Sequence, residues 1–320
     1  MDKDGDEKMQ TELLISAGSA EEVRRYIAAG ANAVMVGEHR FALRMPGEVT
    51  LSELAEIVPW VHKQGAKLYV AVNNIMENDM LDDLTVYIAK LGELQVDAIA
   101  FGDPAVLMAV RQAAPGLPLH WNAEMTSTNY ATARYWASKG AGRFVLAREL
   151  NLEETLEIKR QLDAEMEVQV QVHGITNIYH SKRSLLTNYQ DHQGRPEELQ
   201  KLSLGQEEGL FLIEQERQDE RFPVYEDQNG THIMSSDDVC MLDSLHELLE
   251  GGLDSLKIEG LMKSVEYNET VVRSYRKAID AYEADPAGYE FQEQWLGAIR
   301  ELQDPRRELS YGFFYKEQVY

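Results

Sequence analysis

Polar residues that could carry chemistry follow most of the apolar runs along this chain. They include carboxylates, amides, a guanidinium and an imidazole, which are the groups that active sites use to bind substrates and move protons. Ordinary solvated loops also collect polar residues, so a surface without chemistry is the alternative interpretation. The residues in question are Ser16, Asn73, Asp103, Asn122, Arg148, Glu149, His173 and Glu259.

Three of these residues are the candidates for catalysis. Arg148 could bind an acidic substrate, because a guanidinium makes a two-point contact with a carboxylate. Its neighbour Glu149 is a candidate proton-transfer group, although the two could equally form a plain surface ion pair. His173 ionises near neutral pH and could also act as an acid or base, with a satisfied structural histidine as the alternative.

Five further residues are candidates for substrate binding: Asn73, Asn122, Glu124, Lys257 and Glu259. Lys257 and Glu259 stand two residues apart in one strand-like run, so their side chains share a face. Since buried charges are rarely left unpaired, we expect a mutual ion pair or a binding site there. We predict no metal ligands, because the chain contains no H-E-x-x-H motif.

The elements that must position these residues form a repeating pattern. Short apolar runs alternate with amphipathic segments, and each pair predicts a strand followed by a helix. Eight such units with short connections predict an α/β fold, a (β/α)₈ barrel of the TIM type, whose chemistry lies at the carboxyl ends of the strands. A doubly wound sheet is the alternative, but no G-x-G-x-x-G follows the first run. The predicted strands lie at residues 13–17, 33–37, 67–72, 98–101, 117–121, 143–146, 167–172 and 253–259.

Three regions depart from this repeat. Residues 1–10 predict a flexible tail before a barrel that spans 11–283. Residues 175–235 are polar and poorly periodic, and they predict an insertion after the seventh strand, with strand-like pieces at 210–213, 222–225 and 232–234. Helices are expected at 238–249 and 266–283. Residues 284–320 predict a C-terminal extension whose aromatic stretch packs on the barrel or on a partner.

Composition excludes several classes of protein. The 320 residues include 31 Lys and Arg against 55 Asp and Glu, which gives a net charge of −24. Such a charge repels phosphate backbones, so a nucleic acid would have to be held by a local basic patch or by a partner. A single cysteine, Cys240, excludes disulfide-rich secreted folds. No apolar run is long enough for a membrane helix, so we expect a cytoplasmic protein with no membrane contact.

Several motifs follow one another along the chain: Leu146-Ala147-Arg148-Glu149-Leu150, Val172-His173-Gly174 and Leu256-Lys257-Ile258-Glu259-Gly260. In this order they resemble peptidase family U32, the collagenase-like peptidases, and the resemblance extends from about residue 13 to 315. The resemblance implies a barrel-like fold in a bacterial cytoplasmic protein. It also implies one of several activities. Some members are named peptidases, and others act in the hydroxylation of tRNA wobble uridine with prephenate, of a ribosomal RNA base or of a ubiquinone precursor.

The chain departs from the hydroxylating members at the residues that hold their iron–sulfur cluster. Those members use four cysteines, but Asn177 and Ser184 stand in two of the cysteine positions here. Gln169 and Gln171 likewise stand where the family signature has glutamate and phenylalanine. Oxygen donors do not replace thiolates on such a cluster, so we expect this chain to bind no cofactor of its own.

The resemblance therefore implies the cluster-free subunit of a tRNA wobble-uridine 5-hydroxylation system. The partner would be a larger paralogous U32 protein that carries the iron–sulfur cluster, prephenate would be the co-substrate, and tRNA would bind through the complex. Two alternatives stay open. One is a U32-type peptidase, for which no nucleophile is recognisable, and the other is a non-catalytic binding module.

Overall fold

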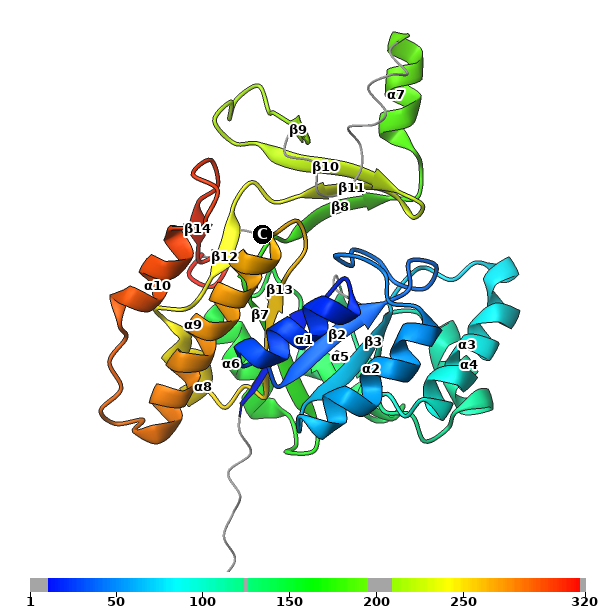
Figure 1. The fold of residues 1–320 in the computed structure, drawn as a ribbon, viewed down its shortest axis with the longest axis horizontal. Helices are drawn as coiled ribbons and strands as arrows, with labels where there is room; N and C mark the ends of the chain where they lie inside the picture. The colour runs from blue at the N-terminus through cyan, green and yellow to red at the C-terminus, as the bar shows by residue number, and fades with distance from the viewer. Residues whose placement is uncertain (1–10, 124–125, 195–208, 317–320) are drawn as a thin grey trace, which may run out of the picture.

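A closed barrel of parallel strands forms the body of the protein (Figure 1). The computed structural model describes residues 11–123, 126–194 and 209–316. Within these residues, eight strands pair in parallel and in chain order, and the last of them pairs with both the first and the seventh, which closes the barrel. The predicted (β/α)₈ fold is thus confirmed. The strands are β1 (Glu12–Ser16), β2 (Ala33–Gly37), β3 (Lys67–Val72), β4 (Ala98–Phe101), β5 (Leu119–Trp121), β6 (Ala141–Val145), β7 (Glu167–Gly174) and β13 (Ser255–Glu259).

A helix follows each barrel strand, and local sequence sets where most of these helices begin. Ser19, Thr50 and Asn151 each accept a hydrogen bond from a backbone N–H of the first turn, as good N-caps do. Gly30 ends the first helix with φ +116°, a left-handed conformation that favours glycine. The helices are α1 (Ala20–Ala29), α2 (Leu51–Lys63), α3 (Leu81–Glu93, after the 3₁₀ turn Asn78–Met80), α4 (Pro104–Ala113), α5 (Tyr130–Ala137), α6 (Leu152–Gln161), α8 (Leu245–Glu250) and α9 (Val265–Ala284).

The two faces of the barrel strands bury different residues. Outward residues such as Leu13, Ile15 and Val70 pack against the helices in one large core cluster. The inward face is lined in part by alanines, which leave room for Met45 from the loop between β2 and α2. This loop therefore fills the barrel from its upper rim, and it brings the residues beside Met45 to the mouth.

A buried ion pair fills the opposite, amino-terminal end of the barrel. Arg143 is 1% exposed, and its guanidinium contacts both carboxylate oxygens of Glu12. Tyr69 donates its hydroxyl to Glu12 Oε2 at 2.6 Å, and Ser255 donates to Oε1 at 2.7 Å. Burial alone would raise the pKa of Glu12, but the charge and hydrogen bonds of Arg143 outweigh it and hold the pKa below its ordinary value.

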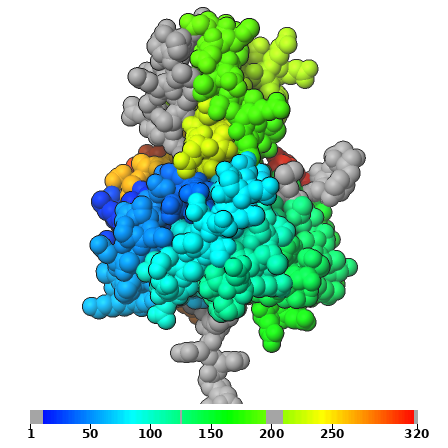
Figure 2. Space-filling model, turned by 90° about the vertical axis from the view of Figure 1, so that its right-hand side faces the viewer, coloured from blue at the N-terminus to red at the C-terminus, as the bar shows by residue number. Residues whose placement is uncertain are grey.

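The insertion after β7 forms a second layer above the barrel mouth (Figures 1 and 2). It contains an antiparallel sheet in the order β8 (Asn177–Ser181), β11 (Gly230–Met234), β10 (Phe222–Asp227) and β9 (Leu210–Leu212), and the helix α7 (Leu185–Gln193). The three strand-like pieces predicted from the sequence correspond to β9, β10 and β11, whereas β8 and α7 were not predicted. Residues 1–10, the predicted tail, lie outside the described residues.

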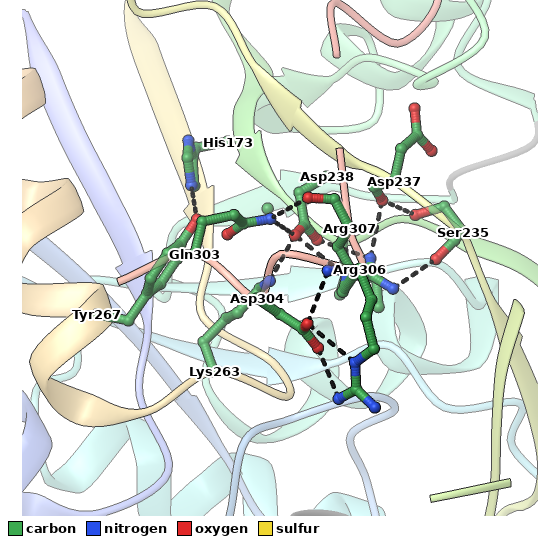
Figure 3. A network of polar contacts seen from close by, with 12 residues as sticks. His173, Ser235, Asp237, Asp238, Lys263, Tyr267, Gln303, Asp304, Arg306 and Arg307 are labelled. Atoms are coloured by element: carbon green, nitrogen blue, oxygen red, sulfur yellow. Dashed lines mark hydrogen bonds and ion pairs between the residues drawn. The ribbon is translucent and has the colours of Figure 1, made fainter. Parts of the chain in front are cut away.

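The helix expected at 238–249 is wrong over its first half. Asp238–Cys240 form strand β12, which runs antiparallel to β7, and α8 begins only at Leu245. The reason is that Asp238 is fully buried and accepts hydrogen bonds from Lys263, Gln303 and Arg307 (Figure 3). Burial alone would raise the pKa of Asp238, but the charges and hydrogen bonds of Lys263 and Arg307 hold it below its ordinary value.

The C-terminal extension packs on the barrel, one of the two outcomes expected from the sequence. It contains α10 (Glu293–Arg300), which lies against α9, and β14 (Leu309–Ser310), which pairs with β12. Phe314 is buried, and its carbonyl accepts a hydrogen bond from Leu152 N at 2.9 Å. The aromatic stretch thus covers the start of α6.

His173 lies under α9 and not at the barrel mouth. The ring is 1% exposed, its Nε2 lies 2.9 Å from the hydroxyl of Tyr267 (Figure 3), and its Nδ1 lies 3.4 Å from that of Tyr275. Burial lowers the pKa of His173 to about 3, so the ring is neutral at physiological pH. Of the two interpretations that the sequence allows, this placement matches the structural one.

The ion pair at the base of the barrel predicts a specific pattern of stability. Arg143→Met leaves Glu12 buried without its cation, so we expect the free energy of unfolding to fall by about 3–5 kcal/mol in urea titrations. The double variant Glu12→Gln, Arg143→Met removes both charges and should recover part of that loss. The exposed Arg160→Ala is the matched control, with a change within about 0.5 kcal/mol. Equal losses in the single and double variants would contradict the prediction.

The buried His173 predicts a pH dependence of stability. The unfolded chain binds a proton on this ring below its ordinary pKa of 6.5, whereas the folded chain does so only below about pH 3. Stability therefore falls as the pH drops through this window, by about 1.4 kcal/mol per pH unit from this ring. His173→Gln cannot take up the proton, so the stability advantage of the wild type over this variant should shrink by about 2 kcal/mol between pH 7 and pH 5. An advantage that stays constant with pH would show that the ring is not held neutral.

Candidate active site

A polar pocket of about 70 Å³ opens at the carboxyl rim of the barrel, beneath the inserted sheet. It brings together four of the residues predicted from the sequence: Asn122, Arg148, Lys257 and Glu259. It also contains residues that were not predicted as site residues, from the loop before α2, from β7 and from the insertion. These are Arg44, Gln169, Gln171, Ile175, Asn177, Met234 and Leu261, together with Val145 and Leu146.

Lys257 and Glu259 form the ion pair that their spacing predicted. Lys257 Nζ lies 2.9 Å from Glu259 Oε2, and both side chains are at least 85% buried. Ser16 donates its hydroxyl to the other carboxylate oxygen, and the same hydroxyl accepts the backbone N–H of Gly260 at 2.9 Å. Glu259 is therefore held in one orientation by β1 and β13 together.

Arg148 and Glu149 follow β6 but differ in their surroundings. Arg148 is 18% exposed and lines the pocket, whereas Glu149 is 47% exposed and is not among the residues that line it. The two side chains contact each other at 3.4 Å. Arg148 is thus placed to meet a molecule in the pocket, and Glu149 is placed to orient Arg148 from outside.

One amide nitrogen in the pocket, Nε2 of Gln169, has no hydrogen-bond partner among the described residues. Gln169 is 1% exposed, and its Oε1 accepts a hydrogen bond from Arg143 at 3.2 Å. Its Nε2 is buried and has no hydrogen-bond partner among the described residues. A buried donor without a partner costs free energy, so a ligand oxygen that accepts this hydrogen bond would be stabilising.

A second pocket of about 320 Å³ adjoins the first and shares Arg44 and Asn122 with it. Asn73, predicted to bind substrate, lines this second pocket, and its Oδ1 accepts the backbone N–H of Leu43 at 3.0 Å. The predicted substrate-binding residue Glu124 lies outside the described residues. The predicted catalytic residue His173 lines neither of these two pockets.

The donors in this chain do not fit an iron–sulfur cluster. The chain has one cysteine, Cys240, and burial raises the pKa of its thiol to about 11. Asn177 and Ser184, which stand at cysteine positions of the resemblance, offer only oxygen and nitrogen donors, and such clusters are held by thiolates. Among the described residues, no group of three or more His, Cys, Asp or Glu could hold a metal ion.

No helix in the described part of the chain is long and apolar enough to cross a membrane.

Comparisons with known proteins give the family of the chain. The family model described as peptidase family U32 matches residues 18–319. The chain is 47% identical to tRNA hydroxylation protein P2 of Bacillus subtilis (strain 168), over 97% of this chain and 99% of that protein. It is 33% identical to tRNA hydroxylation protein P1 of the same strain, over 97% of this chain and 73% of that protein. It is also 31% identical to tRNA hydroxylation protein P of Escherichia coli (strain K12), over 84% of this chain and 68% of that protein. The chain belongs to peptidase family U32.

Proposed function

We propose that this protein takes part in tRNA hydroxylation, at position 5 of the wobble uridine, and that the pocket of about 70 Å³ at the barrel mouth binds a carboxylate group of the co-substrate. The observation that carries this proposal is the 47% identity to tRNA hydroxylation protein P2, which extends over 99% of that protein. The alignment covers 97% of this chain, so it includes the strands and loops that build the pocket.

The chemistry of the pocket suits a small carboxylate. Arg148 supplies a guanidinium, which matches a carboxylate through two parallel hydrogen bonds. The unpartnered Nε2 of Gln169 supplies a further buried donor, and Lys257, whose charge Glu259 balances, supplies an ammonium group on the wall. Prephenate, the co-substrate implied by the family resemblance, carries two carboxylates, one of which would occupy this pocket while the rest of the molecule extends beyond it.

We further propose that the protein acts as the cluster-free subunit beside a larger paralogous U32 protein. Bacillus subtilis has two relatives of this chain, and P1 is the longer, since this chain covers only 73% of it. An iron–sulfur cluster would then be held by the partner, because the donors in this chain do not fit one. The tRNA would be held through the complex in the cytoplasm, which removes the need for a chain of net charge −24 to bind it alone.

The role of Arg148 can be tested in the native host. We expect a deletion strain to lack the tRNA nucleosides that derive from 5-hydroxyuridine, measured by mass spectrometry of digested tRNA. The wild-type gene should restore them, and Arg148→Ala should restore less than a tenth of them, because the carboxylate loses its two-point contact. Arg160→Ala, which changes an exposed arginine on α6, should restore them fully. If Arg148→Ala restored these nucleosides fully, Arg148 would not be part of the co-substrate site.

The subunit role makes a separate prediction about assembly. Affinity purification of this protein from its host under anaerobic conditions should recover a larger, cysteine-rich U32 protein together with iron. Mass spectrometry identifies the partner, and an iron assay on the same eluate tests for the cluster. Recovery of this chain alone and without iron would contradict the subunit role, while leaving its part in tRNA hydroxylation to the genetic test.

A further inference from the structure

The second pocket, of about 320 Å³, is not used by the proposed carboxylate site. It lies between the ends of β3, β4 and β5 and the edge strand of the inserted sheet. Its volume is at the lower end of the range found for small-molecule sites. The residues that matter for its chemistry are Asn73, Asp103, Asn122, Arg44 and His180.

His180 is the outer ring of a stack of three. The rings of His180 and His232 lie 4.6 Å apart at an interplanar angle of 13°, and those of His232 and Tyr225 lie 4.6 Å apart at 17°. The three residues are cross-strand neighbours on β8, β11 and β10. Because β8 is at the edge of its sheet, the stack ends at His180, and this ring lines the pocket.

The stack is rigid and belongs to the fold. His232 and Tyr225 are almost completely buried, and His232 Nε2 lies 3.1 Å from Asp227 Oδ1. His180 Nε2 lies 2.9 Å from the carbonyl of Asn229. A ring fixed in this way loses little conformational entropy when another flat ring stacks on it.

The walls of the pocket offer amide groups. The side chain of Asn122 is 9% exposed and has no hydrogen-bond partner among the described residues. Asn73 uses its Oδ1 for the backbone of Leu43, so its Nδ2 is the group left to face the pocket. Asp103 is committed to the fold, since its two oxygens accept backbone N–H groups of Ala105 and Met76. Amides carry donors and an acceptor, which match the alternating donors and acceptors on the edge of a nucleobase.

We propose that this second pocket holds a pyrimidine base turned out of an RNA loop, stacked against His180 and hydrogen-bonded by Asn122 and Asn73. The inference rests on the proposed role in tRNA hydroxylation and adds the place where the target base sits. Enzymes that modify a base take it out of its stack, and single-stranded RNA is recognised by stacking on rings and by hydrogen bonds to base edges. The shared residues Arg44 and Asn122 place the base directly beside the carboxylate pocket.

The local charge near the pocket also suits a loop of RNA. Lys182 and Arg183 follow directly on β8, one and two residues beyond its last residue. Both are exposed. Lys182 pairs with Glu77 at 2.6 Å and also donates a hydrogen bond to the carbonyl of Ile75 at the rim of the second pocket, so phosphates there would compete with Glu77 for it. Cations beside the pocket would meet the phosphates that flank a base turned into it.

The proposal is tested by removing the base from the RNA and the ring from the protein. The full-length protein, purified from its host with whatever partner it retains, is titrated with a fluorescent anticodon stem-loop RNA that carries either uridine or an abasic ribose at the wobble position. We expect the wild type to bind the uridine RNA about tenfold more tightly, since stacking of one base on a ring has this effect. His180→Ala should bind the two RNAs equally, while His180→Phe, which keeps a flat ring, should retain the preference.

Tyr179→Ala is the matched control. Tyr179 precedes His180 on β8 and is 50% exposed, and it does not line the pocket, so its loss should leave the uridine preference unchanged. Equal preference for uridine in His180→Ala and the wild type would overturn the inference, and so would binding of the two RNAs with equal affinity by the wild type.

Two different experiments separate the failure of the proposed function from the failure of the second pocket as the site of the base. A deletion strain that keeps all its 5-hydroxyuridine-derived nucleosides would overturn the proposed function, and with it this pocket as the site of the base. A deletion strain that loses them, combined with a uridine preference that does not depend on His180, would overturn only the second pocket.

Discussion

Closure of the barrel by β13 is the constraint on which the rest of the structure depends. Because β13 pairs with both β1 and β7, all eight strands point their carboxyl ends at one rim. The other end is filled by the Glu12–Arg143 pair, whose charges are satisfied by each other and by Tyr69 and Ser255. The pocket opens at the upper rim, where Arg148 and Lys257 both line it although more than a hundred residues separate them.

The rim keeps its shape because the inserted sheet is anchored at several points. Asn229, between β10 and β11, donates to the carbonyl of His39 and accepts from the amide of Asn74, so the sheet is tied to two barrel loops. On its other side, β11 leads into β12, where Asp238 holds Arg307 of the C-terminal extension (Figure 3). Both pockets thus have walls fixed before any ligand arrives, and preorganised walls reduce the entropy lost on binding.

The alternation of apolar runs with amphipathic segments predicts the barrel strands and the residues at their ends. It does not predict which residues the loops and the insertion bring to the pockets. The eight strands follow from their apolar runs, and the Lys257–Glu259 pair follows from a spacing of two. His173 was harder to place, because a register shift between Lys257 and Ile258 adds a residue to β7 and changes which way the ring faces. Arg44 could not be predicted as a site residue because it lies in an aperiodic loop, with φ +55°. The position of His180 at the pocket could not be predicted either, because its ring stacks on cross-strand neighbours more than forty residues away. Asp238 resembles the first residue of a helix, and only its buried partners, distant in sequence, show that it starts a strand.

The walls of the two adjoining pockets consist of polar and apolar side chains and, among the described residues, include no cysteine. A reaction between a base and a small carboxylate needs both molecules held side by side, and that task depends on shape, rings and hydrogen bonds. None of these requires thiolates, and Asn177, which stands at a cysteine position of the family resemblance, lines the first pocket. Arg44 and Asn122 line both pockets, and both residues lie in loops of the barrel. The two pockets of this barrel are therefore placed to hold two molecules side by side, which is what the proposed function requires.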